Sequence, residues 1–224
     1  MTDALRVILE IGKKRRVVAG AMDWPGLDRW GTSEDDAVEK LLSYVPRYAD
    51  VAERAGKKSA FARARDVEVV ERVPGSSSTD FWGIAHVPSQ IEREVLSSTD
   101  LERRIVVLQA CWAYFDDVAA RITEDLLPGP RSAGRSHDQI VRHVYINEPE
   151  QFSRKVEVRT PFAEVMTRDG LAAHRQAYLD AIRAYNAQGK AARTWPIQFL
   201  IRRTAHHVMD HAWEMDDRDP SPSG

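Results

Sequence analysis

Two histidines near the C-terminus, His207 and His211, have the residue type and the spacing of metal ligands. They lie in a segment, residues 199–218, that contains neither proline nor glycine and follows Trp195-Pro196, a typical helix start. On a helix, residues four positions apart share one face with their Cβ atoms about 5–6 Å apart, so both imidazoles can bind one divalent cation. We expect an inward-facing stripe that consists of Leu200, Thr204, His207, His211 and Met215.

The third ligand is expected to be His143, one of the seven histidines of the chain. It lies in the middle of a predicted helix among apolar neighbours, whereas His137 lies in the first turn, where a surface or capping role fits better. His206 lies about 100° around the helix from His207 and cannot join the same close site. Each histidine taken singly fits an ordinary hydrogen-bonded core residue, but the three together favour a metal site. This hypothesis requires the ring of His143 to lie within about 8 Å of the other two, given metal–nitrogen bonds of about 2 Å.

The composition is that of an ordinary globular protein, with 43% hydrophobic and 29% charged residues. The net charge of −2 over 224 residues gives no basic excess that would indicate a nucleic-acid or anionic-membrane partner. No run of about 18 apolar residues is present, and the N-terminus lacks the layout of a signal peptide. We therefore expect a cytoplasmic protein that acts on a small molecule, as a monomer or as a homodimer. The one cysteine, Cys111, excludes an intrachain disulfide and a cysteine-rich zinc site.

The first 74 residues predict a small β-β-α-β unit. Strand-forming residues at 5–11 and 17–21 flank a polar turn, which predicts a hairpin, and a third strand is predicted at 66–73. Residues 23–31 are expected to form a loop, because Pro25-Gly26 is typical of a turn.

A helix with one interruption is expected between the second and third of these strands. Thr32 or Ser33 can cap its N-terminus, and the acidic residues 34–36 suit its first turn. Pro46 should kink or split the helix, because proline cannot donate a hydrogen bond to the carbonyl of Leu42.

Residues 75–99 predict an extended connector, and residues 100–219 predict a four-helix bundle, so the whole chain is expected to be α+β. The aromatic pair Phe81-Trp82 of the connector is expected to pack onto one of the two domains. The first bundle helix has an apolar seam of period 3.5 from residue 101 to 126 and should end at Pro128-Gly129-Pro130. Residues 220–224 are expected to be a disordered tail.

The three later helices have recognisable ends. Ser136 and Gln139 form a capping box for the second helix, which Pro149 should bend. The third helix is predicted at residues 168–185, and Gly189 falls in the loop before the fourth. One long crossover between the second and third helices fits a bundle of four helices near 20 residues each.

The segments HDQIVRHVYINEPEQF and RRTAHHVMDHAWEMDDR resemble the DinB superfamily, which includes YfiT-like hydrolases and thiol-dependent S-transferases and isomerases. In that family a histidine of the second helix, with a glutamate five residues later, joins a His-x3-His pair of the fourth helix to bind one divalent metal. The resemblance implies His143 with Glu148 as the first element and His207 with His211 as the second. Pro149, directly after Glu148, departs from the family pattern. Near the N-terminus, AGAMDWPGLDRWGTSEDDAVEKLLSY resembles the HicB-type antitoxin fold over about 40 residues.

Three imidazoles with open coordination positions are typical of a catalytic zinc site. Nickel, iron and manganese also accept imidazole ligands, so the sequence favours zinc without fixing the ion. A bound ion would lower the pKa of a water toward about 7, or would bind a substrate thiolate or carbonyl. Val208 follows His207, so the glutamate of the His-Glu-x2-His metalloproteases is missing and a protease is disfavoured.

Four charged residues on the same helix are further candidates for the site. Asp210 and Glu214 fit acceptors for the ligand rings, although acids at the surface are the ordinary interpretation. Arg202 and Arg203 fit carboxylate-binding residues for a substrate or thiol cofactor, although a solvated basic pair is the more common case.

The resemblance and the three histidines predict a metal-dependent transferase or isomerase that uses a low-molecular-weight thiol such as mycothiol. Two alternatives stay open. One is a metal-dependent hydrolase, in which water replaces the thiol, and the other is a stress-linked binding protein without catalytic activity.

Overall fold

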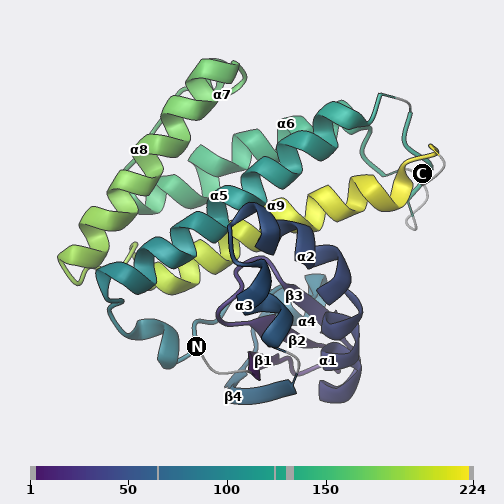
Figure 1. The fold of residues 1–224 in the computed structure, drawn as a ribbon, viewed down its shortest axis with the longest axis vertical. Helices are drawn as coiled ribbons and strands as arrows, with labels where there is room; N and C mark the ends of the chain where they lie inside the picture. Colours follow the sequence, from purple (N-terminus) through teal and green to yellow (C-terminus); the bar gives the residue numbers. More distant parts are fainter. Residues whose placement is uncertain (1–3, 65, 124, 130–133, 222–224) are drawn as a thin grey trace.

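The computed structural model describes residues 4–64, 66–123, 125–129 and 134–221, and its fold is α+β (Figure 1). A mixed four-stranded sheet with three helices forms the N-terminal region, and longer helices form most of the remainder. Pro130 and residues 222–224 of the expected tail lie outside the described residues. Within the described ranges, no helix combines the length and the apolar character that crossing a membrane requires.

The four strands of the sheet lie in the order β3-β2-β1-β4. β1 (Ala4–Ile11) pairs antiparallel with β2 (Val17–Ala21) and parallel with β4 (Asp66–Pro74), and these three strands match the predicted ones. The fourth, β3 (Asp28–Gly31), pairs antiparallel with β2. The loop predicted for residues 23–31 is therefore wrong in its second half.

The strand β3 depends on its partner and not on a local pattern. The N–H of Leu27 donates to the carbonyl of Trp24 at 3.1 Å, and the N–H of Ala21 donates to the carbonyl of Leu27 at 2.9 Å. This turn reverses the chain and brings DRWG against β2. Because DRWG contains two charged residues and a glycine, no alternation of apolar residues marks it as a strand. The element order is β-β-β-α-α-α-β instead of the predicted β-β-α-β.

The helices between β3 and β4 have the predicted start and the predicted interruption. The side chain of Ser33 accepts a hydrogen bond from the N–H of Asp36 at 3.1 Å, so Ser33 is the cap. The helix divides at Tyr44, and Pro46 lies in the first turn of the second segment, where its missing N–H costs no hydrogen bond. The three helices are α1 (Glu34–Ser43), α2 (Val45–Arg54) and α3 (Lys58–Arg63).

The connector contains a short helix, α4 (Ser77–Trp82), and a 3-10 turn, η1 (Ile91–Arg93), where the sequence predicts an extended chain. The prediction that Phe81 and Trp82 pack onto a domain is wrong, because their side chains are 65% and 55% exposed. Their rings contact each other at 4.6 Å between centroids, so part of their apolar surface is covered within the pair.

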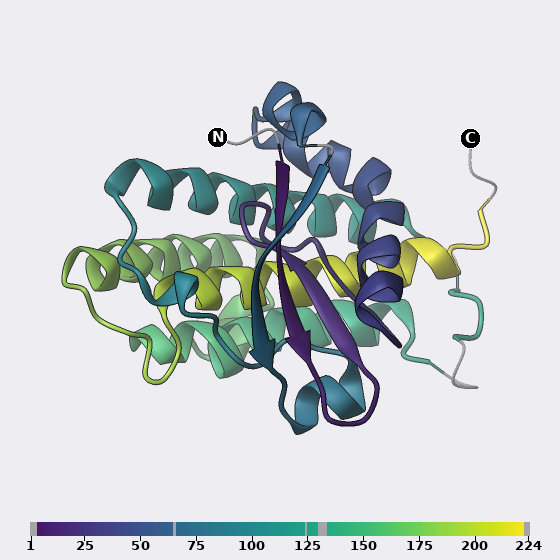
Figure 2. The same ribbon diagram turned by 90° about the horizontal axis from the view of Figure 1, so that it is seen from below.

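Four helices make up most of the rest of the described chain, and one of them, α6, has 11 residues where a helix near 20 residues is predicted. α5, α6 and α9 run alongside one another in both views (Figures 1 and 2), and α8 packs against α5 and α9. The third predicted helix, residues 168–185, corresponds to α8. The bounds are α5 (Ser98–Arg121), α6 (His137–Asn147), α8 (Arg168–Ala187) and α9 (Ile197–Arg218), with a single turn, α7 (Phe162–Val165), before α8.

The helix α5 ends at Arg121, earlier than the sequence predicts. Ile122 has an extended backbone with φ −81° and ψ 111°, although its side chain is buried as the apolar seam requires. Beyond it, the N–H of Leu127 donates to the carbonyl of Arg218 at 2.8 Å. The chain after α5 is thus held by the end of α9. A periodic apolar pattern indicates which side chains are buried and does not show where the helix ends. Because Ile122 is buried although it lies beyond the helix, the pattern predicted too long a helix.

The start of α6 and the bend after it agree with the sequence. The capping box of Ser136 and Gln139 is present. After Asn147 the chain continues as a π turn, η2 (Glu148–Phe152), and a 3-10 turn, η3 (Ser153–Val156). Pro149 lies inside the π turn, which is an arrangement that accommodates a residue without an N–H.

The helix α9 lies at the centre of the molecule. Seventeen of its 22 residues are buried. Figure 2 shows it between α5 and α6, with the sheet lying across it. One hydrophobic cluster includes Leu5 of β1 and Met215 of α9, so the sheet and the helices share a continuous core.

Candidate metal centre

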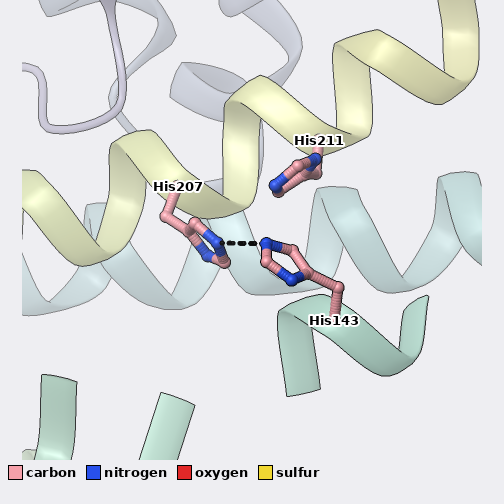
Figure 3. Close-up of side chains that lie close together, drawn as sticks. All are labelled: His143, His207 and His211. Carbon is pink, nitrogen blue, oxygen red and sulfur yellow. Dashed lines mark hydrogen bonds between the residues drawn. The ribbon is translucent and has the colours of Figure 1, made fainter. Parts of the chain in front are cut away.

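Three histidine rings converge between α6 and α9. His207 and His211 project from α9 towards His143 on α6 (Figure 3). The ring centroid of His143 lies 5.2 Å from that of His207 and 4.9 Å from that of His211, and the two rings of α9 are 4.9 Å apart. These distances are well inside the limit of about 8 Å that shared metal–nitrogen bonds impose.

The separations of the ring nitrogens suit a single ion. One nitrogen from each ring lies within 4.8 Å of one nitrogen from each of the others. Nε2 of His143 is 3.3 Å from Nε2 of His207. Two nitrogens bound tetrahedrally at about 2.0–2.1 Å from an ion would lie about 3.4 Å apart. The donor set therefore fits a divalent ion such as zinc.

Packing around α6 and α9 directs the rings toward each other. The buried residues Ile140 and Val144 hold α6 in the core and leave His143 on its half-buried side, facing α9. The ring of Phe152, at the end of the π turn, lies 5.4 Å from the ring of His207. The bend at Pro149 thus supplies an apolar wall to the site.

Two of the three imidazoles are neutral at physiological pH. Burial, followed by the neighbouring His211 and Arg135, lowers the pKa of His143 to about 4. Burial, followed by His211 and His143, lowers the pKa of His207 well below its ordinary value. Neutral imidazole is the form that binds a metal, so neither ring needs to lose a proton to do so.

Hydrogen bonds orient two of the rings. Nδ1 of His211 donates to Oε2 of Glu214 at 2.8 Å, which leaves Nε2 as the free nitrogen. This carboxylate–histidine arrangement is common behind metal ligands. The side-chain amide of Asn147 donates to the carbonyl of His143 at 2.7 Å and to Nδ1 of its ring at 3.1 Å. Ligation through Nε2 of His143 would place the proton on Nδ1, and the Asn147 amide would turn to accept it. Nδ1 of His207 is buried and has no hydrogen-bond partner among the described residues.

Glu214→Gln is expected to weaken zinc binding about tenfold, and Glu214→Ala by about 10–100-fold, because the carboxylate orients His211 and increases its basicity. Competition with a zinc-binding dye measures both affinities. Asp210→Asn is the matched control, since Asp210 is an exposed acid one turn away that faces Arg29 at 3.6 Å. Zinc affinity in both Glu214 variants equal to that of Asp210→Asn would contradict the role given to Glu214.

Glu148 does not join the three histidines. Its carboxylate is fully buried and accepts hydrogen bonds from Nε of Arg175 at 3.1 Å and from Nη2 at 2.8 Å. Nη1 of Arg175 also donates to Asp116 at 2.5 Å. Within the ranges that the structure describes, the group able to hold an ion consists of the three histidines alone.

The interpretation of Arg202 and Arg203 as a solvated pair is wrong, since their side chains are only 2% and 8% exposed. Arg202 donates to Oε1 of Glu92 and to Oδ1 of Asp28, both at 2.7 Å. Burial alone would lower the pKa of Arg202, but the two carboxylates raise it above its ordinary value. Arg202 therefore ties α9 to the sheet and is not available to a substrate. Sequence reasoning missed this, because Glu92 lies 110 residues away with no shared motif.

Comparison with known proteins adds no relative: no family model, no curated protein and no solved structure matches the chain.

Proposed function

We propose that this protein is a metal-dependent enzyme of the DinB type that transfers or isomerises a substrate with the help of a low-molecular-weight thiol. In this proposal, α5, α6, α8 and α9 are the four helices of a DinB-like bundle, and the sheet with α1–α3 is a HicB-like extension. The convergence of His143, His207 and His211 is the observation that carries the proposal.

The three imidazoles would hold the ion, zinc in the first instance, with nickel, iron and manganese as alternatives. When bound, such an ion lowers the pKa of a thiol or a water and so supplies a nucleophile at neutral pH. Glu214 holds the ring of His211 in place, and Phe152 limits the access of water on one side of His207.

One feature favours a thiol over water as the nucleophile, and a second favours the ionised form of either. The carboxylate of Glu214 is engaged by His211 and by Nη1 of Arg218 at 3.2 Å, so it is not free to act as a general base for water. In addition, positive charge lies near the site. The pKa of His207 is lowered mainly by burial, His211 and His143, and to a smaller extent by the cations Arg203 and Arg135. A cationic environment favours the thiolate form of a bound thiol.

The proposal predicts thiol conjugation that requires the metal. Protein loaded with one equivalent of zinc is incubated with a small thiol, such as mycothiol, and a model electrophile, and loss of free thiol is followed against a protein-free blank. We expect a rate above the blank that disappears after chelation and returns with zinc. Ester hydrolysis without added thiol would favour the hydrolase instead. Bound zinc with neither activity would favour a binding protein.

A further inference from the structure

Arg203 is a buried cation for which one side-chain hydrogen bond is found among the described residues. Its side chain is only 8% exposed, and among the described residues no carboxylate lies within ion-pair distance of it. Nη1 donates to Nδ1 of His206 at 2.6 Å, whereas Nε is buried and has no hydrogen-bond partner in the described part of the chain. A buried guanidinium without hydrogen-bond acceptors is costly, and binding an anion would remove that cost.

The neighbouring carboxylates keep Arg203 charged without using its donors. Asp28 and Glu92 are both held by the guanidinium of Arg202, and burial raises the pKa of Asp28. The carboxylate of Glu10 accepts hydrogen bonds from the N–H groups of His86 and Val87 at 2.8 Å and 2.9 Å. Burial lowers the pKa of Arg203 only to about 10, with Asp28 opposing the effect, so the side chain remains protonated at neutral pH.

Arg203 lies one helical turn before His207, on the adjoining part of the same face of α9. Further basic groups come from other elements. The ring centroids of Trp195 and His86 lie 5.6 Å apart. Nζ of Lys155 lies 3.9 Å from the centroid of the Trp195 ring. Lys155 follows Phe152, the wall of the histidine cluster, by one turn. The pKa of His86 is lowered by burial and then by Arg203 and Lys155, as expected of cations gathered at one place.

We propose that Arg203 binds the carboxylate of the small molecule whose reacting thiol reaches the three histidines, with Lys155 contributing further positive charge. This inference rests on the proposed function. Four residues of helix rise by about 6 Å, so the carboxylate and the sulfur of the ligand would be separated by about that distance. The ligand class is therefore a short thiol-carboxylic acid.

A matched pair of probes tests the assignment. Isothermal titration calorimetry compares 4-mercaptobutanoate with the neutral 4-mercapto-1-butanol on zinc-loaded protein. We expect the wild type to bind the carboxylate at least about tenfold more tightly, because charge-assisted hydrogen bonds to a desolvated guanidinium are strong. Arg203→Gln should reduce this preference to less than about twofold, and Arg203→Lys should retain part of it. Arg183→Gln, in an exposed ion pair with Glu102, should leave it unchanged.

The outcomes separate this inference from the proposed function. Zinc content is measured first, and glutarate, which has no thiol, is titrated into chelated protein. If the wild type binds no zinc, the proposed function fails, and the anion site then stands only if Arg203→Lys weakens glutarate binding. Equal affinity of the wild type for the two thiols would overturn the anion site even if Arg203→Gln does not fold. A carboxylate preference that survives in both Arg203 variants would also overturn it.

Discussion

Replacing His207 by alanine is expected to abolish stoichiometric zinc binding while the protein stays folded. The variant retains two of three ligands, so its affinity should fall by more than the roughly 10–100-fold that loss of a ligand's hydrogen-bonding partner costs. The fold should tolerate the change, because alanine favours a helix and the variant loses a buried ring nitrogen that has no partner in the described chain.

Two measurements check this expectation. Elemental analysis after gel filtration should give one equivalent of zinc in the wild type and none in His207→Ala. Added zinc should raise the melting temperature of the wild type but not that of His207→Ala, since only a ligand that binds the native state stabilises it. His174→Ala is the control, because His174 is a buried helical histidine that is hydrogen-bonded to Thr160 at 2.8 Å, away from the cluster. Stoichiometric zinc in His207→Ala would refute the three-histidine site.

Arg202→Met is expected to destabilise the protein by about 3–5 kcal/mol, because it leaves two buried carboxylates without their cation. Asp28 and Glu92 are 1% and 2% exposed, so water cannot replace the lost partner. Burial works to raise the pKa of Glu92, but Arg202 and Ser89 hold it below its ordinary value. The variant should therefore also be less sensitive to acid than the wild type, since its carboxylates take up protons more readily when the cation is missing.

Urea unfolding measures the change in the free energy of unfolding. Arg183→Met, which breaks an exposed ion pair with Glu102, should cost at most about 1 kcal/mol. Adding Asp28→Asn and Glu92→Gln to Arg202→Met should recover part of the loss, because neutral side chains are less costly to bury. A loss of less than about 1 kcal/mol for Arg202→Met would mean that the buried ion pairs contribute little to joining α9 to the sheet.

Local patterns were sufficient to identify the three candidate ligands, whereas their convergence depends on the packing of α6 against α9. The separation of four between His207 and His211 follows from helix geometry, and the place of His143 followed from a capping box that set the start of α6. The breaks at Tyr44 and Pro149 were also predictable, because the effect of proline is confined to its own turn.

What the sequence did not reveal depends on partners distant along the chain. DRWG becomes β3 only because β2 pairs with it. Arg202 and Arg203 have the same residue type and are adjacent, yet one binds two carboxylates and the other binds none within the described residues. The difference arises from the fold, which places Asp28 and Glu92 beside only the first. The prediction that Phe81 and Trp82 pack onto a domain was wrong for a related reason, since the apolar character of a side chain does not specify its packing partner.

The central position of α9 has a consequence for biosynthesis. The contact between Asp28 and Arg202 joins residues 174 positions apart, and the apolar face of the sheet belongs to the same cluster as α9. In a nascent chain, the N-terminal strands therefore leave the ribosome long before α9, the helix that packs against them, has been synthesised. Such long-range closure makes folding slow and leaves apolar surface open to aggregation. We expect newly made chains to depend on chaperones until residues 197–218 have emerged.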